Sequence, residues 1–281
     1  MYEKIALSTL LFVILFSCPI TETFQNVQEN HTNTLDMNTE EEMSNGQQGT
    51  GSGSLVNPSQ YMLSLCPNIK TTRWRQMCEA VFGMDMKKCE LQREYGEKEG
   101  CESMIAAVKK QPSLCDSVNP YVTGVKDGKV VNLTISTDCY MHYAVATLDS
   151  KYCEKSKSPA NCEADIKMEK GQITLEQCKG GYTCLMDYAK IKRDKRACDQ
   201  FKPASGGGEA DSKATCMAMV TGDESYCDSI SSIDWKYRCI GWARWNKAME
   251  SDGVFLLKEC KGNSDCEMLV LYDMEKWAAR N

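Results

Sequence analysis

One cysteine-bearing segment occurs twice in the chain, and it constrains the fold more than any other feature of the sequence. The first copy runs from Ser64 to Cys78 and the second from Ser225 to Cys239. In both, a Ser, a bulky residue and a Cys are followed at the same spacings by Ile, Trp, a basic residue and a second Cys. The rest of the chain varies this unit more loosely, which predicts a repeat architecture.

The number and spacing of the cysteines predict disulfides and no metal site. Of the 17 cysteines, an even number remains when Cys18 near the N-terminus is set aside. Zinc sites favour cysteines two to four residues apart, and no such pair occurs here. We therefore expect eight disulfides, no metal and no cofactor, with these cysteines involved: Cys66, Cys78, Cys89, Cys101, Cys115, Cys139, Cys153, Cys162, Cys178, Cys184, Cys198, Cys216, Cys227, Cys239, Cys260 and Cys266.

The sequence does not determine which cysteines pair with one another, although helix geometry limits the choice. Two cysteines at opposite ends of one straight helix, such as Cys139 and Cys153, would lie about 20 Å apart, whereas a disulfide needs about 6 Å between Cα atoms. The bonds must therefore join different helices. Each is expected to stabilise the fold by about 2–4 kcal/mol, which matters in a chain poor in Leu, Ile, Val and Phe.

The pattern around the cysteines is helical. Cys78, Cys139, Cys184 and Cys239 are each followed about one turn later by an aromatic residue and an Ala, which places them on or beside one helix face. Asp149, Asp194 and Asp223 each precede a Cys by four residues and fit a helix start or a turn, and Thr174 to Gln177 matches a capping box. The predicted fold class is all-α: a disulfide-stapled array of short helical hairpins in four or five degenerate copies, ending in an amphipathic helix.

Two segments interrupt the helical pattern. The β-branched stretch 122–135, with a central Asp-Gly, predicts one small β-hairpin. The Gly-rich stretch 203–211 predicts a flexible loop. We interpret 61–281 as one cysteine-rich helical repeat domain containing this loop, with a division into two domains as the alternative.

The N-terminus predicts export. An apolar run from Ile5 to Phe16 is too short to span a bilayer but suits a signal peptide. It leads into Leu15-Phe16-Ser17-Cys18, which resembles the lipobox of bacterial lipoproteins, so that 1–18 would be a signal peptide and Cys18 the lipidated residue. Several acyl chains on Cys18 would anchor the protein to a membrane. An ordinary secretory signal, removed together with Cys18, is the alternative.

The acidic charge of the chain is concentrated before residue 61. Residues 19–60 carry six acidic residues and no Lys or Arg, and their Asn, Gln, Gly and Ser content predicts a disordered linker, or else a pro-segment that is cut away. Without Glu3, Lys4 and this segment, 32 of the 33 basic and 32 of the 39 acidic residues remain in 61–281. An electroneutral domain has no overall attraction for nucleic acid.

No motif in the sequence predicts catalysis. His142 is the only histidine of the predicted domain, and the patterns of hydrolases, zinc proteases and phosphate-binding loops are absent. A carboxylate pair could serve a glycosidase, but nothing singles one out. We therefore predict that the protein is not an enzyme.

Three further features are candidates for binding or modification. The cluster from Lys190 to Arg196 is either a solvated helix end or a site for an anionic partner, such as a lipid head group or a polysaccharide. Trp235, Trp242 and Ala243 are expected to share a buried seam. Trp245 falls off that seam, and we expect it to pack in the core too, with an exposed contact beside Arg244 as the alternative. Asn30 and Asn132 fit the N-glycosylation pattern, and they are candidate glycan acceptors if the source is eukaryotic.

The cysteine-rich helical units resemble, loosely, repeats of uncharacterised secreted prokaryotic proteins. The resemblance covers most of 61–281 and implies no activity. The function expected from the sequence is a binding or structural module, exported and lipid-anchored at the cell envelope, with an unknown protein or glycan partner. The alternative is a freely secreted toxin, effector or inhibitor, extracellular and soluble.

Overall fold

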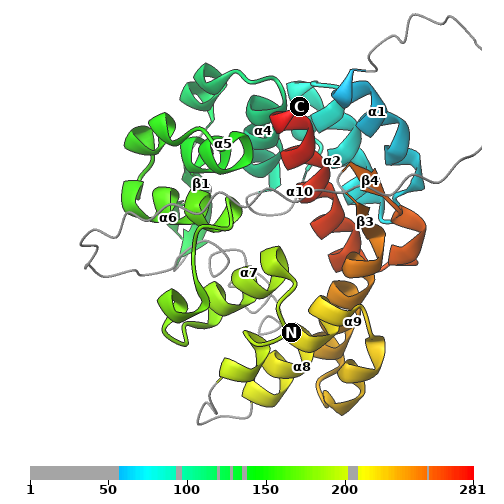
Figure 1. The fold of residues 1–281 in the computed structure, drawn as a ribbon. Helices are drawn as coiled ribbons and strands as arrows, with labels where there is room; N and C mark the ends of the chain where they lie inside the picture. Colours follow the sequence, from blue (N-terminus) through cyan, green and yellow to red (C-terminus); the bar gives the residue numbers. More distant parts are fainter. Residues whose placement is uncertain are drawn as a thin grey trace, which may run out of the picture.

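A computed structural model describes residues 57–92, 97–118, 121–126, 129–134, 138–201, 208–251 and 253–281, and it is almost entirely helical (Figure 1). Cys18, Asn30, the lipobox-like segment and nearly all of 19–60 lie outside the described residues. The α-helices are α1 (Pro58–Leu65), α2 (Thr72–Phe82), α3 (Met86–Cys89), α4 (Glu97–Val108), α5 (Cys139–Thr147), α6 (Pro159–Glu169), α7 (Tyr182–Lys192), α8 (Gly208–Thr221), α9 (Ile233–Ala248) and α10 (Ser264–Arg280).

Short 3₁₀-helices precede most of the long helices, and together they form the repeated unit. They are η2 (Cys66–Asn68), η3 (Pro112–Ser117), η4 (Ser150–Lys155), η5 (Leu175–Cys178), η6 (Cys198–Gln200), η7 (Glu224–Ser229) and η8 (Leu257–Cys260). Each of these, and the short helix α3, carries a cysteine that is bonded to the next α-helix along the chain. The unit therefore occurs eight times, more often than the four or five copies expected, because the spacing within a pair varies from 6 to 24 residues.

All eight expected disulfides are present, and each joins two cysteines that are neighbours in the sequence. As predicted, they run between helices. The pairs are Cys66–Cys78, Cys89–Cys101, Cys115–Cys139, Cys153–Cys162, Cys178–Cys184, Cys198–Cys216, Cys227–Cys239 and Cys260–Cys266. This many disulfides indicates an oxidising compartment outside the cytosol.

Polar caps set several helix starts, as the sequence predicts. Asp149 accepts a hydrogen bond from the Lys151 N–H (3.4 Å), and Asp223 accepts one from the Ser225 N–H (2.9 Å). At η5 the side chain of Gln177 accepts from the backbone N–H of Thr174 (2.7 Å), which completes a capping box. These caps satisfy N–H groups that a helix start leaves without partners.

Two boundaries differ from the sequence expectation. Helix α1 begins at Pro58, inside the predicted linker 19–60, because Asn57 caps it by accepting from the Ser59 N–H (3.0 Å) and Pro suits the first helical position. Helix α8 begins at Gly208, inside the predicted loop 203–211. The stretch of the sequence after Gly208 contains acidic residues, which favour the first turn of a helix.

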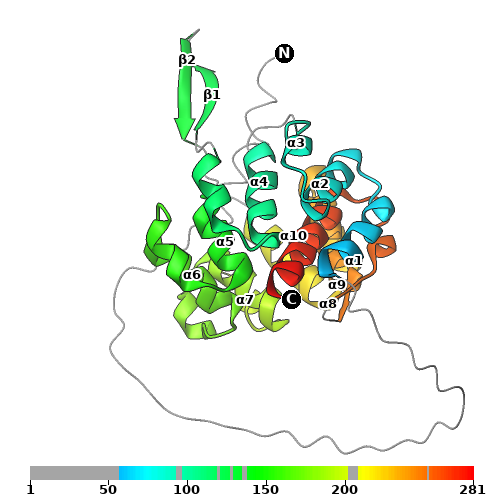
Figure 2. The same ribbon diagram turned by 90° about the horizontal axis from the view of Figure 1, so that it is seen from above.

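The predicted β-hairpin is confirmed. Strands β1 (Tyr121–Lys126) and β2 (Lys129–Thr134) pair antiparallel, with Val122 opposite Leu133 and Lys126 opposite Lys129. The turn at 127–128 and Ile135 lie outside the described residues. Figure 2 shows the hairpin projecting from the helical body. A second short pair, β3 (Met249–Ser251) and β4 (Val254–Phe255), was not predicted.

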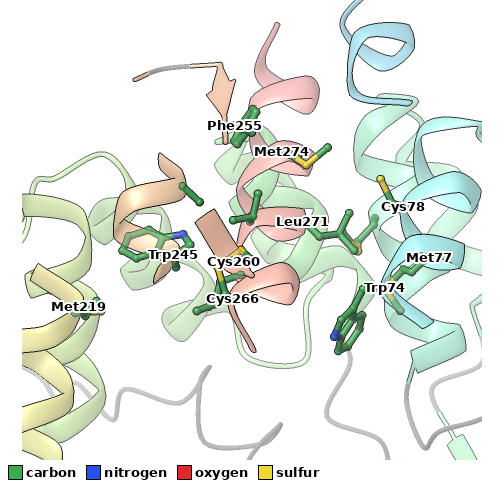
Figure 3. Close-up of a cluster of buried hydrophobic side chains, with 14 of the residues drawn as sticks. Trp74, Met77, Cys78, Met219, Trp245, Phe255, Cys260, Cys266, Leu271 and Met274 are labelled. Atoms are coloured by element: carbon green, nitrogen blue, oxygen red, sulfur yellow. A yellow bond between two sulfur atoms is a disulfide. The ribbon is translucent and has the colours of Figure 1, made fainter. Parts of the chain in front are cut away.

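The C-terminal helix α10 is the centre of the fold. It packs against α1, α2, α4, α5 and α9, so the last described helix meets the first (Figures 1 and 2). Leu271 and Met274 are buried in the main apolar cluster, which Trp74 and Met77 of α2 enter from the other side (Figure 3). The same cluster includes residues from both sides of 203–211, among them Met219.

Candidate functional site: a basic hollow beside the end of helix α7

The turn that follows α7 is fixed at both ends. Arg193 ends the helix in a left-handed conformation (φ 49°), and five residues later Cys198 is bonded to Cys216 of α8. Between them, Asp194 accepts from the Arg196 N–H (2.9 Å) and holds the Arg196 guanidinium through contacts of 2.6–3.0 Å. Because the backbone is held in this way, Lys195 and Arg196 extend outward from a defined position.

Two open hollows adjoin this turn. The larger, of about 670 Å³, lies between the end of α7 and the end of α8. The smaller, of about 320 Å³, is lined by residues 171–176, which run from the end of α6 into the first residues of η5. Tyr188, Lys192 and Arg196 line both, so the hollows form one continuous surface, which we call the basic hollow.

The charge of the basic hollow is not fully compensated. Lys192 and Lys195 are exposed, and no ion pair or hydrogen bond of their side chains is found within the described part of the chain. Within the described residues, Arg193 donates only to neutral oxygens, the side chain of Asn246 (3.3 Å) and the carbonyl of Met249 (3.1 Å). The site thus holds cations that remain available to an anion.

Two carboxylates oppose these cations. The hydrogen bond from Arg196 holds the pKa of Asp194 below its usual range. Hydrogen bonds from its own backbone N–H and from Thr174 lower the pKa of Glu176. Both are therefore ionised near neutral pH, which leaves four cations (Lys192, Arg193, Lys195 and Arg196) against two anions among the lining residues. Such a surface can bind an anion.

The remaining sequence candidates lie elsewhere in the fold. Lys190, the first residue of the basic cluster, turns away from the hollow toward Asp273 of α10 (3.3 Å). His142 on α5 makes a 2.8 Å contact through Nε2 with Glu275 of α10, which is fully buried. Asn132 lies in β2. Among the described residues, no group of His, Cys, Asp and Glu is arranged to hold a metal ion.

The expected core packing is confirmed for Trp245 and is wrong for Trp235. Trp245 is buried in the main apolar cluster, at 4 % exposure, where its ring N–H donates to Asp273 (2.6 Å) and the Lys190 ammonium lies over the ring. Trp235 is 38 % exposed in the first turn of α9, with the Arg238 guanidinium near its ring. Ala243 is buried, as expected.

No protein-family model, curated protein or solved structure matches the chain. Within the described ranges, no helix has the length and apolar character that crossing a bilayer requires. The function must therefore be argued from the chain itself.

Only part of this site carries a signal in the sequence. The run of basic residues from 190 to 196 indicates a cationic site, but the sequence does not show which of these side chains share a surface. Tyr188 and the segment 171–176 carry no sequence signal for binding, because they join the site only through the way η5 folds back on α7.

Proposed function

We propose that the protein is a non-enzymatic binding module outside the cytosol, lipid-anchored through Cys18 at a cell envelope, and that it binds an acidic polysaccharide in the basic hollow. The observation that carries the proposal is the surplus of cations on a surface whose backbone is fixed by a disulfide. The eight disulfides support a location outside the cytosol, and the lipobox-like segment supports the anchor.

The shape of the site favours a chain-like ligand over a single head group. The two hollows adjoin, and cations lie along both. An extended polyanion would contact Lys192, Lys195 and Arg196 together, and its binding should weaken as salt screens these exposed charges. Aliphatic stems of Lys and Arg can pack along a sugar chain while their charged ends contact its acidic groups.

Binding of a heparin-derived octasaccharide to the full mature protein tests the site. We expect Lys192→Gln with Lys195→Gln to weaken binding at least about tenfold, which corresponds to about 1.4 kcal/mol. The matched control is Lys87→Gln with Lys88→Gln, which removes the same charge from two exposed lysines of α3 and should change affinity less than about twofold. Equal loss in both variants, or no binding by the parent at moderate salt, contradicts the proposed site.

Metabolic labelling with a fatty acid tests the anchor. The parent protein should incorporate label and Cys18→Ala should not, because the acyl chains need the Cys18 sulfur and amino group. An unlabelled parent contradicts the anchor and favours the freely secreted toxin, effector or inhibitor.

A further inference from the structure

An ionic cluster connects α6 to the central helix α10. Glu169 at the end of α6 accepts hydrogen bonds from Lys276 and from Arg280 (3.0 Å), both of α10. These side chains are mostly shielded from water, with 17 %, 21 % and 30 % exposure for Glu169, Lys276 and Arg280. Burial strengthens such ion pairs and makes them costly to break, because loss of one partner would leave the other charge buried and uncompensated.

Helix α7 is connected to α10 in a similar way. Lys190 contacts Asp273 of α10 (3.3 Å), and both side chains are less than one-fifth exposed. The other oxygen of Asp273 accepts from the Trp245 ring N–H (2.6 Å). Lys190 and Asp273 therefore form a second polar link between α10 and the segment made of α6, η5 and α7, which we call the α6–α7 arm.

Apolar packing joins α6 mainly to α5. Ile166 and Cys162 are the buried residues of α6, and they belong to a small cluster with α5 that is separate from the main core. Helix α7 packs on α6 and α8, while α10 packs on α1, α2, α4, α5 and α9. Figures 1 and 2 show the arm at the periphery of the molecule and α10 at its centre. Buried residues of η5 and α7, among them Leu175 and Leu185, also belong to the main apolar cluster that contains α10. The ionic cluster therefore adds polar links between the arm and α10 to this apolar packing.

Two more carboxyl groups, those of Asp165 and Asp187, lie in this cluster, and the described residues add no further cation to pair with them. The charges that act on Asp165 of α6 come from Asp187, Lys276 and Glu169, and those that act on Asp187 of α7 come from Lys190, Lys276 and Glu169. The neighbouring α5 and η4 add no further charge on Asp165 within the described residues. Asp165 Oδ2 is buried and has no hydrogen-bond partner there.

The protonation of these groups differs sharply. Burial, together with the charge of Asp187, raises the pKa of Asp165 to about 8, and burial raises the pKa of Asp187 to about 7. Burial opposes the charge of Glu169 too, yet Lys276, Lys190 and Arg280 lower its pKa to about 2. Glu169 and Lys276 therefore stay charged across the physiological range, whereas Asp165 and Asp187 change charge within it.

We propose that the ionic cluster between α6, α7 and α10 is a pH-sensitive latch, which holds the α6–α7 arm on α10 while Asp165 and Asp187 are protonated and loosens as they ionise. With both protons in place, Glu169 and Asp273 face Lys190, Lys276 and Arg280. After ionisation, two new carboxylates compete with Glu169 for Lys276, repel Glu169 and draw water into the interface.

The direction of the pH dependence follows from proton linkage. In the closed form both aspartates have a pKa above the ordinary 3.8, so the closed form binds more protons than the open form. The latch is most stable below about pH 4, weakens as the pH rises, and levels off above about pH 8, where both aspartates are ionised in either form. If opening releases one proton, the equilibrium constant for opening rises about tenfold per pH unit between the pKa values of the open and closed forms.

Hydrogen exchange of the full mature protein at pH 5 and pH 8.5, corrected for the intrinsic rate, tests the latch. We expect peptides from 159–192 to exchange at least about tenfold faster at the higher pH, whereas peptides of α10 change little. Asp165→Asn with Asp187→Asn copies the protonated form in shape and cannot ionise. This variant should keep the arm protected at pH 8.5 as well as the parent protein does at pH 5.

The control is Glu163→Gln with Glu154→Gln, which removes two exposed carboxylates from α6 and η4 and should leave the parent's pH response intact. If the asparagine variant fails to fold, Lys276→Gln gives a second test, since loss of this cation should speed exchange of the arm already at pH 5. Equal protection of the parent arm at both pH values overturns the proposal. So does a pH response that persists in the asparagine variant, or a Lys276→Gln arm as protected as the parent's.

Discussion

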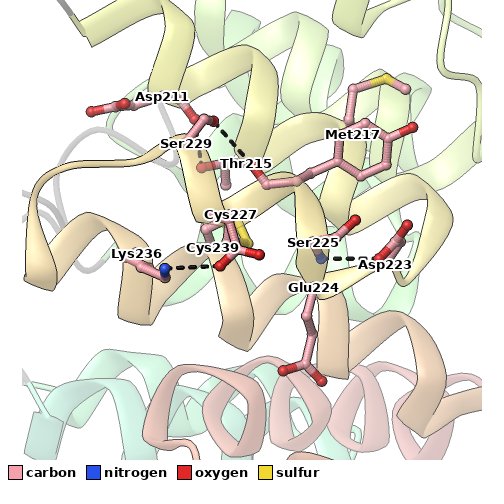
Figure 4. The surroundings of a disulfide bond; sticks show 12 residues. Asp211, Thr215, Met217, Asp223, Glu224, Ser225, Cys227, Ser229, Lys236 and Cys239 are labelled. Atoms are coloured by element: carbon pink, nitrogen blue, oxygen red, sulfur yellow. Dashed lines mark hydrogen bonds and ion pairs between the residues drawn. A yellow bond between two sulfur atoms is a disulfide. The ribbon is translucent and has the colours of Figure 1, made fainter.

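The two most similar segments of the chain, Ser64–Cys78 and Ser225–Cys239, form the same local structure in different surroundings. Both place the first cysteine in a 3₁₀-helix, the second in the next α-helix, and close a disulfide across 12 residues (Figure 4 shows the second). In both, the Ile is buried. The tryptophans differ, since Trp74 is 2 % exposed and Trp235 is 38 % exposed.

The cause of this difference is the C-terminal helix. The start of α10 covers the first copy, where Ser264 accepts from the Trp74 ring N–H (2.8 Å) and the main core surrounds the ring. The second copy belongs to a small separate cluster with α8. The repeated residues thus determine the local unit, whereas the role of the tryptophan depends on what packs over it.

The largest expected difference between the copies comes from the tryptophans. Trp74→Ala removes a buried ring and should lower the free energy of unfolding by about 3–5 kcal/mol. Trp235→Ala, the matched control in the second copy, should cost less than about 1 kcal/mol, because much of that ring already faces water. Denaturant unfolding of the oxidised protein measures both. Similar losses would mean that the two copies are equally well covered.

The disulfides should reveal how far the copies are equivalent. Cys66→Ala with Cys78→Ala, and Cys227→Ala with Cys239→Ala, each open a loop of the same length, for which the chain-entropy model gives about 3 kcal/mol. We expect thermal unfolding to show losses that agree within about 1 kcal/mol. A much larger loss in the first copy would show that native packing, more than loop closure, sets the contribution of these bonds.

The smallest expected losses come from the caps of the two helices. Fully buried Glu267 of α10 accepts from the Lys70 and Thr71 N–H groups (2.7 and 2.9 Å) ahead of α2, while Ser232 caps α9 within its own unit (3.4 Å to the Trp235 N–H). Glu267→Gln leaves one N–H facing an amide donor and should cost about 1–3 kcal/mol. Ser232→Ala should cost about 0.5–2 kcal/mol. A smaller loss for Glu267→Gln than for Ser232→Ala, measured by denaturant unfolding, would contradict this order.

Much of the fold could be predicted because its determinants are local. The Asp caps, the capping box at Thr174 and the spacing of cysteine, aromatic residue and Ala all act within one or two turns. The hairpin at 122–135 follows from β-branched residues around an Asp-Gly, and the absence of short cysteine spacings correctly favoured disulfides.

What could not be predicted depends on contacts between distant residues. Glu267 lies 197 residues from Lys70, and Lys276 lies 107 residues from Glu169, so nothing in either local pattern indicates the pair. The central position of α10 has the same origin. Half of the basic hollow could be predicted, because its cations are neighbours in the sequence. The opposite wall could not, because it comes from residues 171–176.

The pairing of sequence neighbours in every disulfide bears on how the chain matures. Sixteen cysteines allow about two million complete pairings, and the native one is the simplest of them. A polypeptide that enters an oxidising compartment from its N-terminus can close each bond as soon as the second sulfur of the pair emerges, before any later cysteine is within reach. Maturation by this route can proceed stepwise along the chain, with little need for an isomerase to correct the pairing.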